Sequence, residues 1–369
     1  MPSPVYFASL RASLRRNLLQ KVGQLLDKME LAARLSPEQL VAVKVHFGEH
    51  GNTSFVPPVF VREVVQSILK TGARPFVTDA NTLYRGSRSN AIKHLETATA
   101  HGFTAITLGA PVIIADGLRA QAGETVPIEG IHRRSVSIAE AIARADALVA
   151  VSHFKLHEAT GFGGAIKNIG MGAASRDGKL QMHSSVSPHV NRDACLGDGI
   201  CVRACTFGAI SLVEKKAAID EEKCTGCAEC LGVCPADAIE IEWNQGLNRL
   251  GELMAEYAAG AMAGKDGRCF FVNFVTQVSP ACDCYGMNDA PIVPDQGIFA
   301  STDPVALDQA CLDAIQQAPG NRQTRLTNAF AAGDDKIRDI YPKVPYLCQL
   351  EHAEKIGIGT RAYALVPIG

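Results

Sequence analysis

The sequence predicts an α/β fold, a mostly parallel three-layer sandwich interrupted by a small inserted α+β domain. From residue 41 onward, apolar runs of strand length alternate with helical patterns. The alternation stops at about residue 191 and resumes at about residue 244, and the segment between contains two copies of one short pattern. We therefore expect a discontinuous α/β domain of residues 1–190 and 244–369, with a second domain of residues 191–243 nested inside it.

The N-terminal segment of residues 1–20 predicts an amphipathic helix. Arginines interrupt its apolar residues, whereas a secretory signal peptide needs an unbroken apolar stretch. Five apolar residues recur at roughly helical spacing: Leu10, Leu14, Leu18, Val22 and Leu25. Without an export signal we expect a cytoplasmic protein, in which the 12 cysteines stay reduced and serve metal binding or catalysis.

Hydrophobic periodicity and helix-start signals predict the elements of the α/β domain in order. Strands are expected at residues 41–47, 74–79, 111–115, 147–152 and 268–278. Helices are expected at residues 57–69, 89–100, 138–145, 247–262 and 303–315. Asp303 followed by Pro304 is typical of an N-cap and a first helical residue. This alternation implies parallel strands joined by right-handed crossovers.

The composition narrows the class of protein. With 36 basic and 38 acidic side chains the net charge is −2, so no excess of cations is available to neutralise nucleic-acid phosphates. A hydrophobic fraction of 47% and a charged fraction of 20% are typical of a globular chain. The longest apolar runs are strand-sized, so we expect no membrane span and no nucleic-acid partner.

The second copy of the repeated pattern reads Cys224-x2-Cys227-x2-Cys230-x3-Cys234-Pro235. Gaps of two residues allow three thiolates of one loop to surround one face of an iron–sulfur cubane. In bacterial two-cluster ferredoxins the fourth cysteine of such a run binds the other cluster. The segment resembles a bacterial two-cluster ferredoxin domain. A zinc ribbon, the main alternative, would have two separated cysteine pairs.

The first copy lies 29 residues upstream and reads Cys195-x2-Asp198-x2-Cys201-x3-Cys205, with aspartate in place of the second cysteine. Carried over position by position, the resemblance assigns to cluster I the residues Cys195, Cys201, Cys234 and, as a candidate, Asp198. It assigns to cluster II, a [4Fe-4S] cluster, the residues Cys224, Cys227, Cys230 and Cys205. Cluster I is either a [4Fe-4S] cluster with an aspartate ligand or a [3Fe-4S] cluster, because carboxylate binds such iron more weakly than thiolate. Alternatively, Asp198 caps the amides of its own loop and touches no iron.

The clusters themselves have two interpretations. They either cross-link the inserted domain, as structural zinc does in other proteins, or transfer electrons. Electron transfer is the better interpretation, because tandem clusters form a short electron path and zinc would suffice for a cross-link.

Polar residues follow the predicted strands, whose carboxyl ends share the edge where parallel sheets bind ligands. This pattern appears after the strands ending near residues 47, 79, 152 and 278. With a lysine from the glycine-dense segment 161–172, the candidate catalytic residues are His46, Glu49, His153, Lys155, His157, Lys167, Cys282 and Cys284. We expect them to converge on a single pocket.

Each of these candidates has a second interpretation. His46 and His153 are either reactive or hydrogen-bonded core histidines. His153 and His157 have the spacing that bridges a metal on a helix. Cys282 and Cys284 project to one side if extended, where they hold a soft metal, supply thiolate chemistry, or stay buried and inert. The glycine-dense segment is either an anion cradle or a place of tight packing.

The resemblance extends beyond the insert. Four strings carry it: Lys44-Val-His46-Phe-Gly-Glu49, Gly161-Phe-Gly-Gly-Ala-Ile-Lys167-Asn168-Ile-Gly-Met-Gly172, Cys282-Asp283-Cys284 and Ser301-Thr-Asp303-Pro-Val-Ala-Leu-Asp308. They resemble an uncharacterised iron–sulfur-centre family, domain of unknown function 362, whose members often carry a ferredoxin insert. The resemblance implies one α/β domain interrupted by a ferredoxin unit. It implies no particular reaction.

These observations predict an iron–sulfur oxidoreductase. The insert would accept electrons from a donor protein and pass them through two clusters to a small-molecule substrate or a metal in the α/β cleft. Histidines and Glu49 would supply the protons that reduction consumes. One alternative is a ferredoxin-like electron carrier without chemistry of its own, and another is a metal- or cluster-handling protein. The sequence identifies neither the substrate, nor the electron donor or acceptor, nor the oligomeric state.

Overall fold

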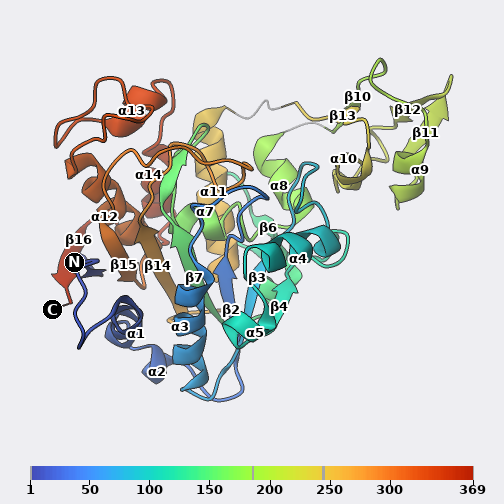
Figure 1. Cartoon of the computed structure of the whole chain (residues 1–369). Helices are drawn as coiled ribbons and strands as arrows, with labels where there is room; N and C mark the ends of the chain where they lie inside the picture. The colour runs from blue at the N-terminus through green and yellow to red at the C-terminus, as the bar shows by residue number, and fades with distance from the viewer. Residues whose placement is uncertain (1, 185–186, 243–245, 369) are drawn as a thin grey trace.

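The computed structural model describes residues 2–184, 187–242 and 246–368 and shows a large sheet with helices on both faces (Figure 1). The sheet has eight strands in the order β16-β1-β15-β14-β7-β2-β3-β4. All of them run in one direction except β15, which pairs antiparallel with both of its neighbours. The predicted fold class, a mostly parallel α/β domain, is confirmed.

The five predicted strands form the parallel half of this sheet. They are β2 (Leu40–Val45), β3 (Arg74–Asp79), β4 (Val112–Ile114), β7 (Ala147–His153) and β14 (Cys269–Val275). Every residue of β7 and β14 is buried, because both faces of the sheet are covered. The β-branched and aromatic residues of these strands therefore read as continuous apolar runs rather than as an alternating pattern.

The antiparallel edge was not predicted, and the expected N-terminal helix is confirmed only from Leu18 onward, where Val22 and Leu25 are buried in α1 (Leu18–Lys28). Residues Ser3–Ala8 form β1, which lies between β15 (Gly297–Ser301) and β16 (Tyr363–Pro367). Helix α1 begins only at Leu18, where Asn17 and Gln20 form a capping box. Leu14 is fully exposed and contributes to no helix face. Pairing with two strands from the far end of the chain determines the structure here, and local periodicity cannot reveal that.

Two apolar cores make the three layers. One core packs α1 (Leu18–Lys28), α3 (Pro58–Leu69) and α4 (Ala91–Ala100) against the face of β2 that carries Val41 and Val43. The other packs α7 (Ala165–Ile169), α11 (Leu247–Met262) and α12 (Pro304–Gln317) against the opposite face, which carries Ala42. Alternate residues of one strand thus enter different cores, as the pleat of a strand requires.

The helix expected at residues 138–145 is also confirmed only in part. Residues Ser135–Ala139 form β6, which pairs antiparallel with β5 (Gly123–Pro127), and α6 (Glu140–Ala143) is a single turn. Val136 and Ile138 point to the same side of β6 and pack against α11. A Cβ on Gly260 of α11 would lie 2.2 Å from Val136, so the hairpin needs a glycine at that contact. The alternation of Val136 and Ile138 was the available signal for a strand.

The segment between α8 (Arg176–His183) and α11 contains only short elements in its described part. They are β10 (His189–Val190), α9 (Ile200–Ala204), β11 (Ile210–Val213), β12 (Lys216–Ile219), α10 (Glu229–Val233) and β13 (Ile239–Glu240). Strands β10 and β13 pair with each other, and β11 pairs with β12. Figure 1 shows this segment projecting from one side of the sheet domain.

Candidate functional site

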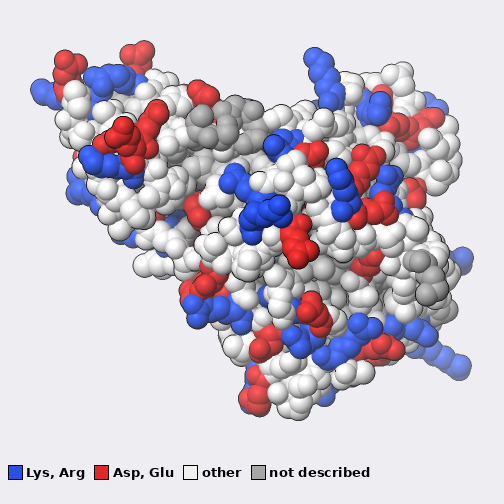
Figure 2. Space-filling model, turned by 180° about the vertical axis from the view of Figure 1, so that it is seen from behind, with Lys and Arg blue, Asp and Glu red and all other residues white. Residues whose placement is uncertain are grey.

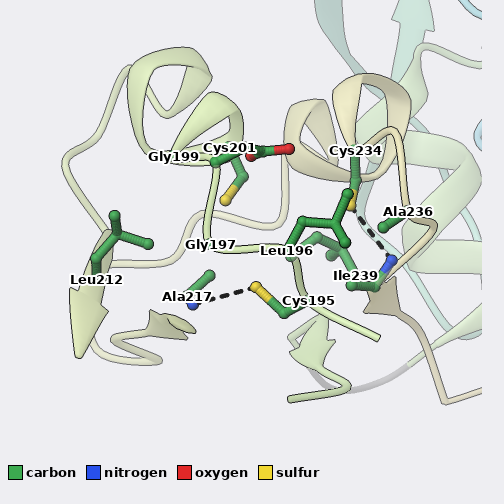
Figure 3. Close-up of a pocket in the computed structure, with 12 residues that line it drawn as sticks. Cys195, Leu196, Gly197, Gly199, Cys201, Leu212, Ala217, Cys234, Ala236 and Ile239 are labelled. Carbon is green, nitrogen blue, oxygen red and sulfur yellow. Dashed lines mark hydrogen bonds between the residues drawn. The ribbon is translucent and has the colours of Figure 1, made fainter. Parts of the chain in front are cut away.

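Two hollows in the inserted segment are lined by cysteines. The first, of about 320 Å³, is lined by Cys195, Cys201 and Cys234 together with Asp198 (Figure 3). The second, of about 340 Å³, is lined by Cys205, Cys224, Cys227 and Cys230. The last cysteine of each repeat therefore lies in the hollow of the other repeat. This exchange is the ligand arrangement of two-cluster ferredoxins.

The two repeats also share their backbone geometry. The residue before each short helix, Gly199 or Ala228, has a left-handed conformation with φ of 67° or 55°. The last cysteine of each repeat accepts a hydrogen bond from the amide four residues on, Ala209 to Cys205 and Ala238 to Cys234, at 3.3 Å in both cases. The duplication seen in the sequence is thus repeated in three dimensions.

The cysteines of the hollows fit an iron–sulfur group. Their sulfurs accept amide hydrogen bonds, including one from Ala217 to Cys195 at 3.4 Å, and this interaction favours a thiolate (Figure 3). Burial, reinforced by neighbouring thiols, raises the pKa of Cys230 to about 12, so a bound cation is required to keep this sulfur ionised at neutral pH. Soft thiolates in such numbers suit iron–sulfur clusters.

Asp198 stands on the rim of the first hollow. Its side chain is exposed, and its Oδ1 accepts a hydrogen bond from the amide of Ile200 at 2.9 Å. One carboxylate oxygen therefore caps the start of α9, as the loop-capping interpretation expects.

The inserted segment packs against the sheet domain through the loop after β3. Arg85 donates a hydrogen bond to the carbonyl of Pro235, which directly follows Cys234, and its Nη1 lies 3.6 Å from Asp237 Oδ2. Leu83 belongs to the same apolar cluster as Cys195 and Cys234. The same loop reaches the sheet edge, because the hydroxyl of Tyr84 donates to the carbonyl of Cys284 at 3.2 Å.

A larger hollow of about 1010 Å³ lies where the two parts meet. Its lining includes Lys93 of α4, Arg119, Arg176 of α8 and Glu229 of α10. The Oε2 atom of Glu229 is buried and accepts no hydrogen bond among the described residues. The hollow lies beside α10, which carries Cys230, and it was not predicted from the sequence.

The candidate residues at the carboxyl end of the sheet gather around three centres. The first is Asp283, which is fully buried. His153 Nδ1 lies 2.8 Å from its Oδ1, and Lys155 Nζ lies 3.2 Å from its Oδ2. Burial alone would raise the pKa of Asp283, but His153 and Lys155 outweigh it and hold the pKa below its usual range.

His153 is fully engaged in this first centre. Its Nε2 contacts the carbonyl of Thr276 at 2.9 Å, so both ring nitrogens face acceptors. This arrangement does not favour the interpretation of His153 and His157 as a metal-bridging pair, since neither nitrogen of His153 is left for a metal. Residues Lys155–His157 form the short strand β8 rather than a helix, which also removes the helical spacing.

The second centre is Asp79 at the end of β3. Its Oδ1 lies 2.8 Å from Nζ of Lys44, and its Oδ2 lies 3.6 Å from Arg88, which also binds Glu49 at 3.0 Å. His94 Nε2 lies 3.5 Å from the same carboxylate. Burial raises the pKa of Asp79, yet Lys44 and the histidines reverse this effect and keep it well below the usual value.

Besides Asp79 itself, three charged residues of these two centres were not among the candidates: Lys44, Arg88 and Asp283. Lys44 carried a usable signal, because a lysine inside the apolar run of β2 must find a buried partner. Together with Glu49, Asp79, His153 and Lys155, they form a network that we call the polar edge.

His46 lies between the two centres. Its Nδ1 accepts a hydrogen bond from the amide of Gly48 at 2.9 Å. Burial, followed by the positive charge of Arg88, lowers the pKa of His46 well below its usual value despite Asp79 and Asp283. His46 is therefore neutral near pH 7 and carries its proton on Nε2.

The third centre is the pair of Cys282 and Cys284, which we call the thiol pair. The pair does not lie on an extended strand, as the sequence suggested, because Tyr285 N donates to Cys282 O at 3.1 Å and closes a turn. One ligand atom each of His157, Cys282 and Cys284 lie within 4.8 Å of one another. Lys167 Nζ lies 3.3 Å from Cys282 Sγ.

The glycine-dense segment is a place of tight packing. The amides of Ala165 and Ile166 at the start of α7 donate to the carboxylate of Asp308 at 2.7 and 2.9 Å. A Cβ on Gly164 would lie 2.3 Å from Asp308 Oδ1. The protein's own carboxylate therefore occupies the position of an external anion. Of three further cysteines in the α/β domain, Cys269 and Cys311 are buried and Cys348 is half-buried.

Charge of both signs is distributed over the surface. Figure 2 shows lysines and arginines interspersed with acidic side chains on the face turned away from the view of Figure 1. Among the described residues, no helix combines the length and the hydropathy that crossing a membrane requires.

Comparison with known families decides the classification. Residues 41–313 match the family described as Domain of unknown function (DUF362). The chain belongs to this family. The match begins in β2 and ends in α12, so it includes the polar edge, the thiol pair and the inserted cysteine segment.

Curated relatives match over shorter stretches. The chain is 47% identical over 47 residues to a subunit of the ion-translocating oxidoreductase complex of Methanosarcina acetivorans, covering 13% of this chain and 18% of the relative. It is 30% identical over 69 residues to the PorD subunit of pyruvate synthase from Methanothermobacter marburgensis, covering 19% of this chain and 82% of the relative. The chain thus spans less than a fifth of the first relative and most of the second.

A solved structure covers more of the chain at lower identity. The lactate racemase apoprotein from Thermoanaerobacterium thermosaccharolyticum is 14% identical, with a TM-score of 0.43. The alignment covers 86% of this chain and 58% of the racemase chain.

Proposed function

We propose that this protein is an iron–sulfur oxidoreductase in which the insert of residues 191–243 receives electrons and the α/β domain of residues 1–190 and 244–369 holds the acceptor. Cys195, Cys201 and Cys234 hold the first cluster, with Asp198 at its fourth position. The second, a [4Fe-4S] cluster, is held by Cys205, Cys224, Cys227 and Cys230. When bound, such clusters accept and donate single electrons.

The contact between the two parts carries this proposal. Arg85 binds the carbonyl next to Cys234, and the neighbouring Tyr84 binds the carbonyl of Cys284. Two consecutive residues of one loop therefore contact both the first hollow and the thiol pair. A carrier that only exchanged electrons with other proteins would not need its ligand segment fixed to a reactive edge.

The residues of the sheet edge suit an anionic or electron-rich acceptor. Lys44, Arg88, Lys155 and Lys167 bring four cations to this edge, and all four lie at buried or half-buried positions. Such cations stabilise negative charge that develops during reduction. The neutral His46, with its proton on Nε2, can donate a hydrogen bond to such negative charge.

The names of the relatives agree with a redox role. One is a subunit of an oxidoreductase complex and the other a subunit of pyruvate synthase. We therefore expect an electron-donor or electron-acceptor protein as a partner of the insert. A small-molecule substrate completes the reaction.

A potentiometric titration of anaerobically purified protein, followed by EPR, tests the proposal. We expect reversible cluster reduction, together with iron and sulfide in the amounts that two clusters require. The variant Arg85→Ala should shift the EPR signal of the cluster bound by Cys234, whereas the exposed control Arg62→Ala should not. A protein without reversible reduction contradicts the proposal.

A further inference from the structure

The thiol pair has a geometry that iron binding in the insert does not explain. The turn closed by Tyr285 brings the two side chains together, and both cysteines are free thiols. Asp283, between them, points into its own centre and is held there by His153 and Lys155. The turn is thus anchored by a buried ion-pair network, and the two sulfurs are held on the other side of the chain.

The two sulfurs have different surroundings. Cys282 is fully buried, and its Sγ receives Lys167 Nζ at 3.3 Å and the amide of Cys284 at 3.4 Å. Cys284 is partly exposed. A hydrogen bond from the Cys284 thiol, aided by Lys167 and His157, lowers the pKa of Cys282 against the effect of burial, and the same hydrogen bond raises the pKa of Cys284.

The tautomer of His157 argues against a metal at this site. Its Nδ1 accepts hydrogen bonds from the amides of Ala159 at 3.1 Å and Thr160 at 3.2 Å. The neutral ring therefore carries its proton on Nε2 and acts toward the sulfurs as a donor rather than as a ligand. The ammonium of Lys167, 3.3 Å from Cys282 Sγ, would also repel a metal ion bound to that sulfur.

We propose that Cys282 and Cys284 form a reversible dithiol–disulfide couple whose reduced form is stabilised by the contact of Lys167 with Cys282. This couple can take up two electrons, and its natural exchange partner is a dithiol. The inference does not depend on the clusters.

The chemistry of exchange follows from the asymmetry of the pair. A thiolate of an external dithiol attacks Sγ of Cys284, the partly exposed residue of the pair, the disulfide bond breaks, and Cys282 leaves as a thiolate beside Lys167. The second thiol of the reagent, deprotonated, then attacks the mixed disulfide, and Cys284 leaves and takes up a proton. The reagent ends as a disulfide and the protein as a thiolate and a thiol. A low leaving-group pKa accelerates such exchange.

Equilibration with buffers of reduced and oxidised dithiothreitol tests this inference on the anaerobically purified, iron-loaded protein. Alkylation and peptide mass spectrometry then measure the fraction of chains with a 282–284 disulfide. We expect one reversible transition. Lys167→Gln should lower the equilibrium constant for reduction about tenfold, because an ion pair of this kind shifts a thiol pKa by about one unit.

Matched variants make the result specific. The exposed Lys93→Gln should leave the constant unchanged, and Cys348→Ser should leave the transition intact. Circular dichroism verifies that each variant is folded. Absence of a 282–284 disulfide in every buffer overturns the inference, and so does one zinc ion per chain that is lost in Cys282→Ser. The readout is a peptide mass, so it is independent of the EPR signals that test the clusters.

Discussion

The inserted segment and the polar edge hold their reactive groups in opposite ways. In the insert, cysteine sulfurs line hollows and receive hydrogen bonds from backbone amides such as Ala209 and Ala238. At the polar edge, the charged groups are paired with one another at 2.8 to 3.6 Å. We therefore expect the insert to depend on a group that the chain does not supply. At the polar edge, the protein itself supplies the opposite charges.

Removal of iron tests this difference most strongly. A small unit that needs its metal loses its structure when the metal is removed. After chelation under oxidising conditions, we expect proteolytic cleavage within residues 191–242 to increase at least about tenfold, a level typical of a lost metal-dependent fold. The thermal transition of the sheet domain should persist. Limited proteolysis with peptide mapping measures the first effect, and calorimetry the second.

The control is the same protein in the same oxidant without chelator. Equal protection of residues 191–242 with and without iron would show that the insert folds on its own, and the contrast drawn here would be wrong.

Asp79→Ala is the reciprocal experiment at the polar edge. The substitution leaves Lys44 buried without its carboxylate, so we expect a loss of about 3–5 kcal/mol in the free energy of unfolding. Iron content should not change. The matched control is Glu38→Ala, because the Glu38–Arg74 pair is exposed and should contribute little to the free energy of unfolding. Urea denaturation measures both. Similar losses in the two variants would contradict a special role for burial.

The difference between the two regions also explains what the sequence could predict. The cysteines of the insert are close in the chain, and a ligand run fixes both the spacing and the chemistry, so the groups around each hollow could be anticipated. The polar edge joins residues more than 200 positions apart, such as Glu49 and Asp283, whose backbones pair at 2.9 Å. The positions of the strand ends predicted that these loops meet. They did not predict which charged side chains form pairs with one another.

The errors have the same cause. Strand β1 is formed by pairing with β15 and β16, from the opposite end of the chain. Strand β6 is formed by packing against α11, whose Gly260 permits the close approach. In both places a helical pattern was present, and contacts distant in sequence overrode it. Helix α11 and the N-cap Asp303, whose signals are local, were predicted within a residue or two.

The thiol pair lies beside the polar edge, on the same turn as Asp283. The pH dependence of its redox exchange should distinguish it from the paired charges of that edge. The pKa of Cys282 is lowered and that of Cys284 is raised, so the reduced pair at neutral pH is one thiolate and one thiol. Reduction of the disulfide therefore takes up one proton, whereas oxidation of dithiothreitol releases two. The exchange constant should therefore rise with pH across the neutral range, by up to about tenfold per pH unit.

The ionisable groups that interact electrostatically with the pair are Tyr84, Arg88, His157, Glu158, Lys167, Tyr285 and Tyr341. Of these, Lys167 should set the slope, because it contacts Cys282 directly. In Lys167→Gln the dependence should weaken as Cys282 regains its proton. A constant independent of pH in the wild-type protein would mean that both thiols are protonated and that the ion pair has no effect.

The smallest expected effect concerns Asp198. Here, as at the polar edge, a charged side chain of the protein is bonded to another group of the protein. Its carboxylate is exposed and already bonded to the amide of Ile200. If it acts as a cap, Asp198→Ala should cost about 0.5–1 kcal/mol and leave about seven iron atoms per chain. Asp198→Cys, which restores the residue type found at Cys227, should raise the content to about eight. Wild-type protein with eight iron atoms, one of them lost in Asp198→Ala, would instead make the carboxylate a ligand. In that case the hydrogen bond from Ile200 would compete with iron for the carboxylate of Asp198. The structure of the loop around Asp198 would then depend on the bound iron.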